Sequence, residues 1–175
     1  MKKIRDFKVS KDKPKVRYVG QKGSAQNALR SELYRYAHER LEEACEQGML
    51  FEVIAICDML ITDRMEAFCQ YLLHDDDMQF ETMSIAQALA ALGSAIADKL
   101  PSAKKSPEWK SLQQRLQRFS EARNFALHSF VLVKNSAKTS SLEERINFIE
   151  DAAEDGIKLV REISAFTNKH MKFDD

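Results

Sequence analysis

The chain has 175 residues, 44% of them hydrophobic and 31% charged, which is enough to bury the core of one domain of ordinary size. It contains only five Gly and three Pro, a composition that favours helices over a β-sandwich or barrel. The longest apolar run, 49–61, is interrupted by Glu52 and Asp58 and is far shorter than the roughly 20 residues of a membrane span, so we expect no membrane segment.

The chain begins with a basic segment. Residues 1–22 contain nine Lys or Arg and two Asp, and because the formal net charge of the whole chain is zero, the remainder is acidic. The charge pattern divides the chain into a basic N-terminal arm, 1–23, and one helical domain, 24–175. The arm could contact RNA phosphates or an acidic partner surface, could be a solvated leader, or could extend over a neighbouring subunit. It lacks the apolar core of a secretion signal.

Two long helices are predicted after the arm. The first spans 24–47, with Ser24 as its cap and Gly48 at its end. Its apolar residues recur at three- and four-residue steps and predict one buried face, composed of Leu29, Leu33, Tyr36, Ala37, Leu41 and Ala44. The second helix spans 50–73. Its first half is apolar nearly all round, which predicts a central helix enclosed by its neighbours.

Three further helices complete the domain. The third begins at Ser84 and is ended by Pro101, after which a linker follows. The fourth covers 107–133 after a serine cap and a first-turn proline, and the last covers 141–167 and opens with a Ser-x-x-Glu capping box. We therefore predict an all-α fold, an antiparallel bundle of about five helices with the basic arm in front.

Cys45, Cys57 and Cys69 form no Cys-x-x-Cys pair and no Cys/His cluster, so we expect no zinc site. An odd number of cysteines within apolar helices favours reduced, packed thiols and a cytoplasmic location. The chain contains no phosphate-binding glycine loop, dinucleotide motif or nucleophile elbow. We therefore expect neither a metal nor a cofactor.

The fourth helix carries the most informative stretch of the chain, EARNFALHS, which contains Arg123, Asn124 and His128. In an α-helix, Asn124 and His128 lie about 40° apart, whereas Arg123 and His128 lie about 140° apart and about 7.5 Å along the axis, so only a long side chain could join them. Asn124 is a poor helix former at a mid-helix position. A permanently charged anion binder beside a side chain that titrates near neutral pH suits phosphodiester chemistry.

Arg-Asn-x-x-x-His near the end of a late helix in a small all-α protein resembles the HEPN superfamily, whose members carry an Arg-x(4–6)-His motif, often with a polar residue after the Arg. The motif corresponds here to Arg123, Asn124 and His128, and the likeness of fold extends over roughly residues 25–168. The resemblance implies a metal-independent endoribonuclease that acts in host defence or as a toxin. It also implies a two-fold homodimer whose motifs face one another across a shared cleft.

The implied reaction is attack of a ribose 2′-hydroxyl on the adjacent phosphate, which leaves a 2′,3′-cyclic phosphate and a free 5′-hydroxyl. In it His128 acts as general base or acid, Arg123 binds the scissile phosphate, and Asn124 fixes the His tautomer or holds a phosphate oxygen. One His cannot easily be base and acid at once, so the second motif of the dimer is expected to supply the other group. RNA is then the substrate, and an antitoxin or another defence-system protein is a candidate partner.

One position departs from the pattern of a branch of that family. In that branch, a Tyr two places after the His is modified by a partner nucleotidyltransferase antitoxin. Here Phe130 stands at that position and has no hydroxyl. This departure argues against inactivation by an antitoxin that modifies the Tyr, and it favours a role in defence or a stand-alone role.

Other interpretations of the motif remain open. His128 could be a satisfied interface histidine and Arg123 a solvated surface charge. The protein would then be a non-catalytic helical dimer, HEPN-like or generic, that binds RNA, a nucleotide or a protein partner. A transcriptional regulator is less favoured, because no short Gly-containing turn between two helices marks a helix-turn-helix.

Charged and polar residues also interrupt the most apolar helix. Asp58, Thr62 and Glu66 line up at four-residue steps, with Asp63 beside them. They could form a polar wall that orients His128 or Arg123, since a charge rising from a central helix usually finds a partner. The favoured alternative is a solvated stripe.

Overall fold

The computed structural model describes residues 25–74, 83–132 and 141–171, so the basic arm predicted at 1–23 lies outside the described residues. Every regular element within these ranges is helical, which confirms the predicted all-α bundle. The elements are α1 (Ala25–Gln47), α2 (Leu50–Leu73), α3 (Ile85–Lys99), α4 (Pro101–Lys105), α5 (Pro107–Asn124), a π-helical turn η1 (Phe125–Ser129) and α6 (Leu142–His170).

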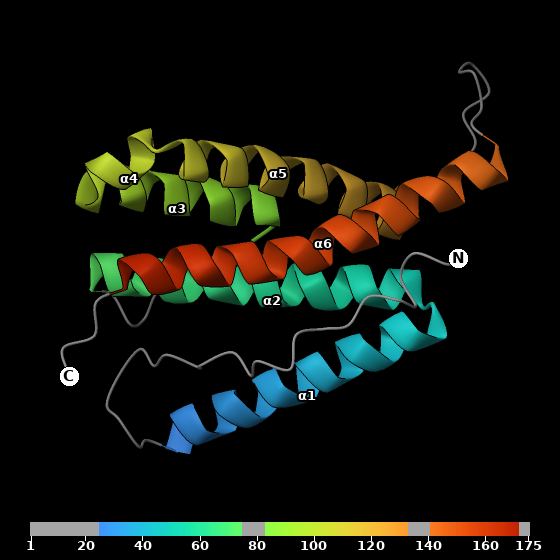
Figure 1. Ribbon diagram of the computed structural model, residues 1–175, viewed down its shortest axis with the longest axis horizontal. Helices are drawn as coiled ribbons and strands as arrows, with labels where there is room; N and C mark the ends of the chain where they lie inside the picture. Colours follow the sequence, from blue (N-terminus) through green and yellow to red (C-terminus); the bar gives the residue numbers. More distant parts are fainter. Residues whose placement is uncertain (1–24, 75–82, 133–140, 172–175) are drawn as a thin grey trace.

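Helix α2 is the centre of the bundle. It packs most extensively against α6 and also contacts α1, α3 and α5, as its apolar sequence predicted. Helices α3, α4 and α5 cover one side of the α2–α6 pair, and α1 lies on the opposite side of α2 (Figure 1). A tight turn at Gly48 makes α1 and α2 antiparallel. The φ of Gly48 is 71°, a left-handed conformation that glycine adopts without strain.

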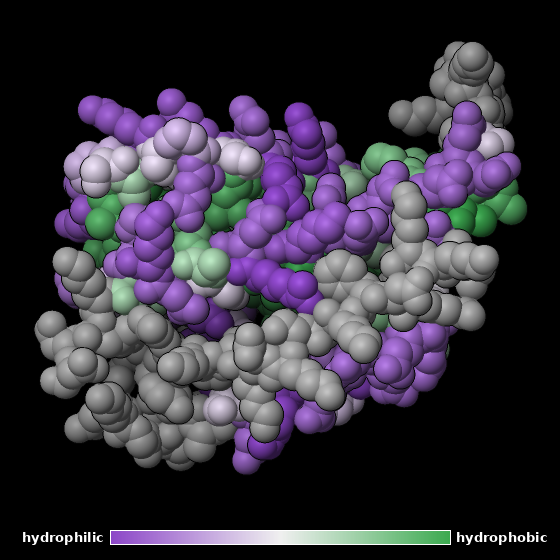
Figure 2. All heavy atoms as spheres, in the orientation of Figure 1, coloured by the Kyte–Doolittle hydropathy of each residue, from purple (hydrophilic) through white to green (hydrophobic). Residues whose placement is uncertain are grey.

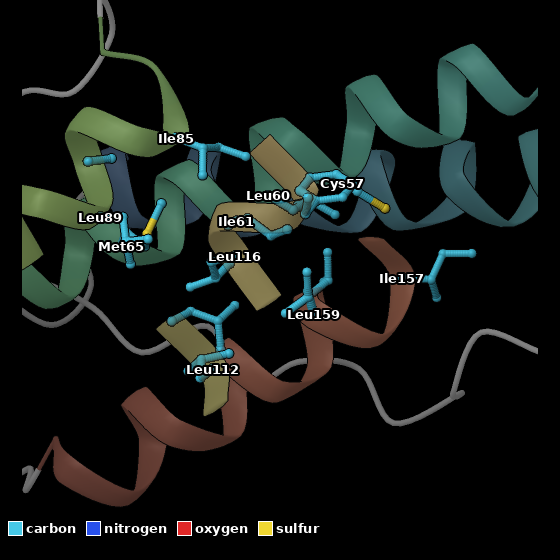
Figure 3. Close-up of a cluster of buried hydrophobic side chains, with 14 of the residues drawn as sticks. Cys57, Leu60, Ile61, Met65, Ile85, Leu89, Leu112, Leu116, Ile157 and Leu159 are labelled. Atoms are coloured by element: carbon cyan, nitrogen blue, oxygen red, sulfur yellow. The ribbon is translucent and has the colours of Figure 1, made fainter. Parts of the chain in front are cut away.

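Buried hydrophobic side chains of α2, α5 and α6 meet in the core (Figure 3). Cys57 and Ile61 of α2 lie there with Leu116 of α5 and Leu159 of α6. Burial of such apolar surface contributes roughly 25 cal/mol per Å² and is the main favourable force for the fold. The same packing places α2 and α5 side by side, and these two helices carry the candidate site described below.

Serine caps define the starts of three helices. Ser84, Ser106 and Ser141 each accept a hydrogen bond from the backbone N–H three residues on, and the first and last form complete capping boxes. Residues 101–105, predicted as linker, instead form the short helix α4. Pro101 ends α3 and also occupies the first turn of α4, where its missing N–H is not needed.

The predicted buried face of α1 is wrong in part. Leu29, Leu33 and Tyr36 are exposed by 56%, 58% and 63%. Ala37, Leu41 and Ala44 of the predicted face are buried, and the inward face also includes Tyr34 and Cys45, which were not predicted. The Tyr34 hydroxyl donates a hydrogen bond to Asp63 of α2, and this polar contact helps to select the stripe that faces inward. Apolar periodicity alone cannot reveal such a contact.

Helix α2 is also less enclosed than predicted, because Ala55 and Met59 are exposed to solvent. In the view of Figure 2 most of the described surface is hydrophilic, and hydrophobic atoms are visible both at the end of the molecule where α6 begins and toward the opposite end, near α3 and α4. No helix in the described ranges combines the length and the apolar composition needed to cross a bilayer.

Candidate functional site

The motif lies at the carboxyl end of α5, which is anchored by its buried face. Trp109, Leu112, Leu116, Phe119 and Ala122 are all buried, at three- and four-residue steps. Asn124, the residue whose helix propensity is poor, is the last residue of α5.

The helix does not continue as an α-helix to residue 133, as the periodicity predicted. Residues 125–129 form the π-helical turn η1, and the turn that follows at 130 and 131 has no regular helical structure. In a π-helix the hydrogen bonds run from residue i to residue i+5. His128 lies within this turn, whereas Arg123 is five residues earlier, near the end of α5. The π turn alters the spacing between the two residues from that of an α-helix, and the long Arg123 side chain covers the remaining distance.

The three motif side chains meet around the guanidinium of Arg123. Its Nη1 donates to the Oδ1 of Asn124 at 3.0 Å and lies 3.4 Å from the Nε2 of His128. Arginine can only donate, so this contact requires a lone pair on Nε2 and places the imidazole proton of a neutral ring on Nδ1. Asn124 and His128 are exposed, and the Arg123 side chain is 27% exposed. The imidazole is thus exposed to solvent, while the lone pair of Nε2 faces Arg123.

A carboxylate of the central helix completes the cluster. The Oδ2 of Asp58 accepts hydrogen bonds from Arg123 Nε at 3.1 Å and from Nη2 at 3.0 Å. Burial raises the pKa of the Asp58 carboxyl above its ordinary value, and the Arg123 guanidinium opposes this rise only in part. Asp58 therefore holds one edge of the guanidinium while the opposite nitrogen faces Asn124 and His128.

The polar stripe of α2 serves more than one purpose. Asp58 reaches Arg123, which is the orienting role that was the less favoured prediction for this stripe. The other carboxylates of the stripe have other partners. Asp63 accepts a hydrogen bond from Arg30 at 2.6 Å, and Glu66 accepts one from Gln70 at 3.4 Å. Of the charged residues in the stripe, Asp58 is the one with a contact to the motif.

A glycine sets the distance between the helices at this point. A Cβ at Gly156 of α6 would lie 2.7 Å from Cε2 of Phe119 and 3.1 Å from the Cβ of Cys57. Phe119 lies one turn before Arg123 on α5, and Cys57 is the neighbour of Asp58 on α2. The close approach of α6 thus fixes the two helices whose side chains meet in the cluster.

The surroundings of the motif are apolar and partly exposed. We call the exposed members the apolar rim, and they are Phe51, Leu127, Val131, Leu132, Leu142 and Phe148. Two ring contacts connect the elements of the rim. Phe51 meets Phe130 edge-to-face at 5.3 Å, and Phe125 meets Phe148 edge-to-face at 5.1 Å. The rim therefore joins the starts of α2 and α6 to the π turn.

Comparison of the chain with family models, curated proteins and solved structures gives no match. The resemblance to the HEPN superfamily therefore rests on the sequence motif.

Potential sites for other ligands are few in the described parts of the chain. No three His, Cys, Asp or Glu side chains there come together as metal ligands. A shallow hollow of about 660 Å³ lies between α3, α4 and α5 and is lined by Gly93, Lys104 and Trp109 among others. None of the three motif residues lines it.

Sequence reasoning found the three motif residues and missed part of what holds them. The charge of Asp58 within an apolar helix was a usable signal, although Asp58 lies 65 residues from its partner Arg123. The low helix propensity of Asn124 marked the place where the α-helix gives way to the π turn. No signal in the sequence pointed to Arg145, which contacts the end of the π turn.

Proposed function

We propose that this protein is a metal-independent endoribonuclease of HEPN type that acts in host defence or as a toxin. The observation that carries the proposal is the contact of Arg123 with His128 on the π turn, with Asp58 bound to the other edge of the guanidinium. A cation is thereby held beside an imidazole nitrogen that carries a lone pair, and a phosphodiester that draws the guanidinium away would leave this nitrogen able to take a proton.

The proposed reaction begins at Nε2 of His128. This nitrogen takes the proton of a ribose 2′-hydroxyl, the 2′-oxygen bonds to the adjacent phosphorus, and the bond from phosphorus to the 5′-oxygen breaks. The products are a 2′,3′-cyclic phosphate and a 5′-hydroxyl. Arg123 binds the non-bridging oxygens, where charge builds up in the transition state. Asn124 orients the Arg123 guanidinium, and in this structure it contacts Arg123 rather than His128.

The leaving 5′-oxygen needs a proton, and a second subunit is proposed to supply it. Isologous two-fold contacts bring identical surfaces together, so a patch beside the motif would bring two motifs together. The apolar rim is such a patch, and Val131 within it is 82% exposed. Large exposed apolar side chains gathered at one end of a molecule mark a protein–protein contact surface. The His128 of the second copy would then act as the general acid.

The test is cleavage of a 5′-labelled generic RNA in excess EDTA by wild type and by His128→Ala. We expect the rate to fall by about 10²- to 10⁴-fold in the variant, because a positioned acid or base contributes about that much. A substrate with a 2′-deoxyribose at the cleaved position should stay intact. His74→Asn is the matched control, since His74 is exposed, lies away from the motif and has a left-handed φ of 53° that Asn tolerates.

A mixing experiment tests the composite site. Arg123→Ala and His128→Ala are each expected to be inactive, and a mixture of the two dimers should recover part of the activity if the sites are shared. Val131→Asp should shift the protein from dimer to monomer in analytical ultracentrifugation and abolish cleavage. Equal cleavage, or none, by wild type and His128→Ala would instead favour the alternative, a non-catalytic helical dimer that binds RNA, a nucleotide or a protein partner. A binding role would use the same contacts around Arg123 but would need no proton transfer by His128.

A further inference from the structure

The segment after the π turn is tied to the start of α6 by one arginine. Arg145 Nη1 donates to the backbone carbonyl of Phe130, and Arg145 Nη2 donates to that of Leu132 at 3.1 Å. Phe130 is the C-cap of η1 and Leu132 follows outside the helix, where backbone carbonyls need donors from elsewhere. The planar guanidinium satisfies both carbonyls at once, which a single ammonium cannot do in the same geometry.

The same side chain also reaches the beginning of the π turn. The guanidinium of Arg145 lies 5.8 Å from the ring centroid of Phe125, the first residue of η1. The Phe125 ring in turn meets Phe148, which lies almost one turn further along α6. Helix α6 therefore holds the π turn at both ends, and His128 lies between the two points of attachment.

The contacts of Arg145 with residues 125–132 form a strap between α6 and the π turn, and the start of α6 that carries Arg145 is well fixed. Arg145 lies in the first turn of α6, directly after the capping box in which Ser141 accepts from the N–H of Glu144 and Glu144 accepts from the N–H of Ser141. Ile149, one turn further on, is fully buried. The guanidinium is thus carried by a helix start that is fixed to the core.

We propose that Arg145 is a positioning residue that keeps residues 125–129 in the π conformation and thereby keeps His128 beside Arg123. Without the strap, the turn would relax to an α-helix, whose hydrogen bonds run from i to i+4. His128 would then rotate away from Arg123 toward the separation of about 140° that α-helical spacing prescribes. Arg145 itself does not touch the substrate. Its role in catalysis rests on the proposed function, whereas its effect on the position of His128 does not.

The experiment compares Arg145→Met, which keeps length but removes charge and donors, with Arg145→Lys and wild type. Arg115→Met is the matched control, because Arg115 also joins α6 to its neighbour, through Glu162 and Asp155, but far from the π turn. Three quantities are measured for each folded variant. They are the side-chain ¹⁵N resonances of His128, amide hydrogen exchange over 125–132, and kcat and KM for metal-free RNA cleavage.

In Arg145→Met we expect shifted His128 resonances, faster exchange over 125–132, and a kcat lower by about 10- to 100-fold with KM nearly unchanged, since a displacement of about 1 Å can cost that much. Arg145→Lys should lie between Arg145→Met and wild type, and Arg115→Met should match wild type in all three. Wild-type His128 resonances and wild-type exchange in Arg145→Met would overturn the inference, whatever happens to the rate. If wild type itself cleaves no RNA, the proposed function fails, and the resonances and exchange still decide the role of Arg145.

Discussion

The Nη1 of Arg123 lies 3.4 Å from the Nε2 of His128, although the two residues are five positions apart in one continuous helical segment. His128 lies in the π turn that begins at Phe125, and the long Arg123 side chain reaches it from the end of α5. Asp58 binds the other edge of the guanidinium. The pair is therefore a product of local backbone geometry and of a contact between α2 and α5, and each of these can be tested separately.

Arg123→Lys should abolish most of the proposed cleavage while leaving the fold intact. Lysine keeps the charge but lacks the planar fork that contacts Asp58, Asn124 and His128 together. We expect kcat to fall by about 10²- to 10³-fold, the typical cost of losing one donor to a developing oxyanion. Arg118→Lys, at an exposed position on the same helix, serves as the control and should retain wild-type kcat.

Asp58→Asn should separate activity from stability. The pKa of Asp58 is raised because burial outweighs the attraction of Arg123, so the folded state binds the proton more tightly than the unfolded chain does. The stability that comes from this proton is present below the unfolded pKa and is lost as pH rises through the folded pKa, which means that the ionised carboxylate is a net cost at neutral pH. Removal of that charge also leaves Arg123 without its carboxylate.

These two effects of Asp58→Asn oppose one another, and we expect the free energy of unfolding at pH 7 to change by less than about 1 kcal/mol. The kcat of RNA cleavage should nevertheless fall by about tenfold, because Arg123 is no longer held toward His128. Urea unfolding and steady-state kinetics measure the two quantities. An unchanged kcat would show that Asp58 does not orient Arg123.

Gly156→Ala should destabilise the protein by about 1–3 kcal/mol, the usual cost of forcing extra volume into a packed core. The added Cβ would lie 2.7 Å from the buried ring of Phe119, which cannot move aside freely. Gly93→Ala is the matched control in another helix, where the nearest atom of Trp109 is 4.0 Å from the added Cβ. It should be neutral or stabilising by up to about 1 kcal/mol, because alanine is the better helix former. Thermal unfolding followed by circular dichroism distinguishes the two.

The stability of the fold should decrease on acidification in part through His38. Burial lowers the pKa of His38, and the nearby Arg64 and Arg161 lower it further. The folded state thus prefers the neutral imidazole. Its contribution to stability is complete above the unfolded pKa of about 6.5 and is lost as pH falls through the lower folded pKa. Between pH 7 and pH 5, His38→Gln should show a smaller loss of unfolding free energy than wild type.

The slope that one histidine contributes cannot exceed about 1.4 kcal/mol per pH unit. The pKa of His170 is lowered as well, first by burial, so the variant should keep some pH dependence. His74→Asn, at an exposed position, controls for the loss of a histidine as such. If His38→Gln and wild type lose stability in parallel, burial of His38 does not contribute to the acid sensitivity of the fold.

Most of the secondary structure could be read from the sequence because its determinants are local. The serine caps at Ser84, Ser106 and Ser141 act within one turn, and Pro101 acts through its own missing N–H. The apolar character of α2 likewise predicted its central position.

Where two faces could be buried, the sequence did not decide between them. In α1 the later part of the predicted face is buried, whereas Leu29 and Leu33 in its earlier part are exposed, because the helix is turned so that Tyr34 meets Asp63. The rotation of a helix about its axis depends on what it meets, and the partner here lies 29 residues away.

By itself the sequence determined an all-α bundle, the approximate bounds of its helices and the three residues of the motif, all of which follow from interactions within a few turns of chain. The tertiary structure alone decided that Arg123 and His128 meet. That contact lies beside a π turn whose end is contacted by Arg145 of α6, and Asp58 of α2 supplies a carboxylate to the same guanidinium. Both depend on how whole helices pack and cross, and this packing is a collective property of the core that local spacing does not specify.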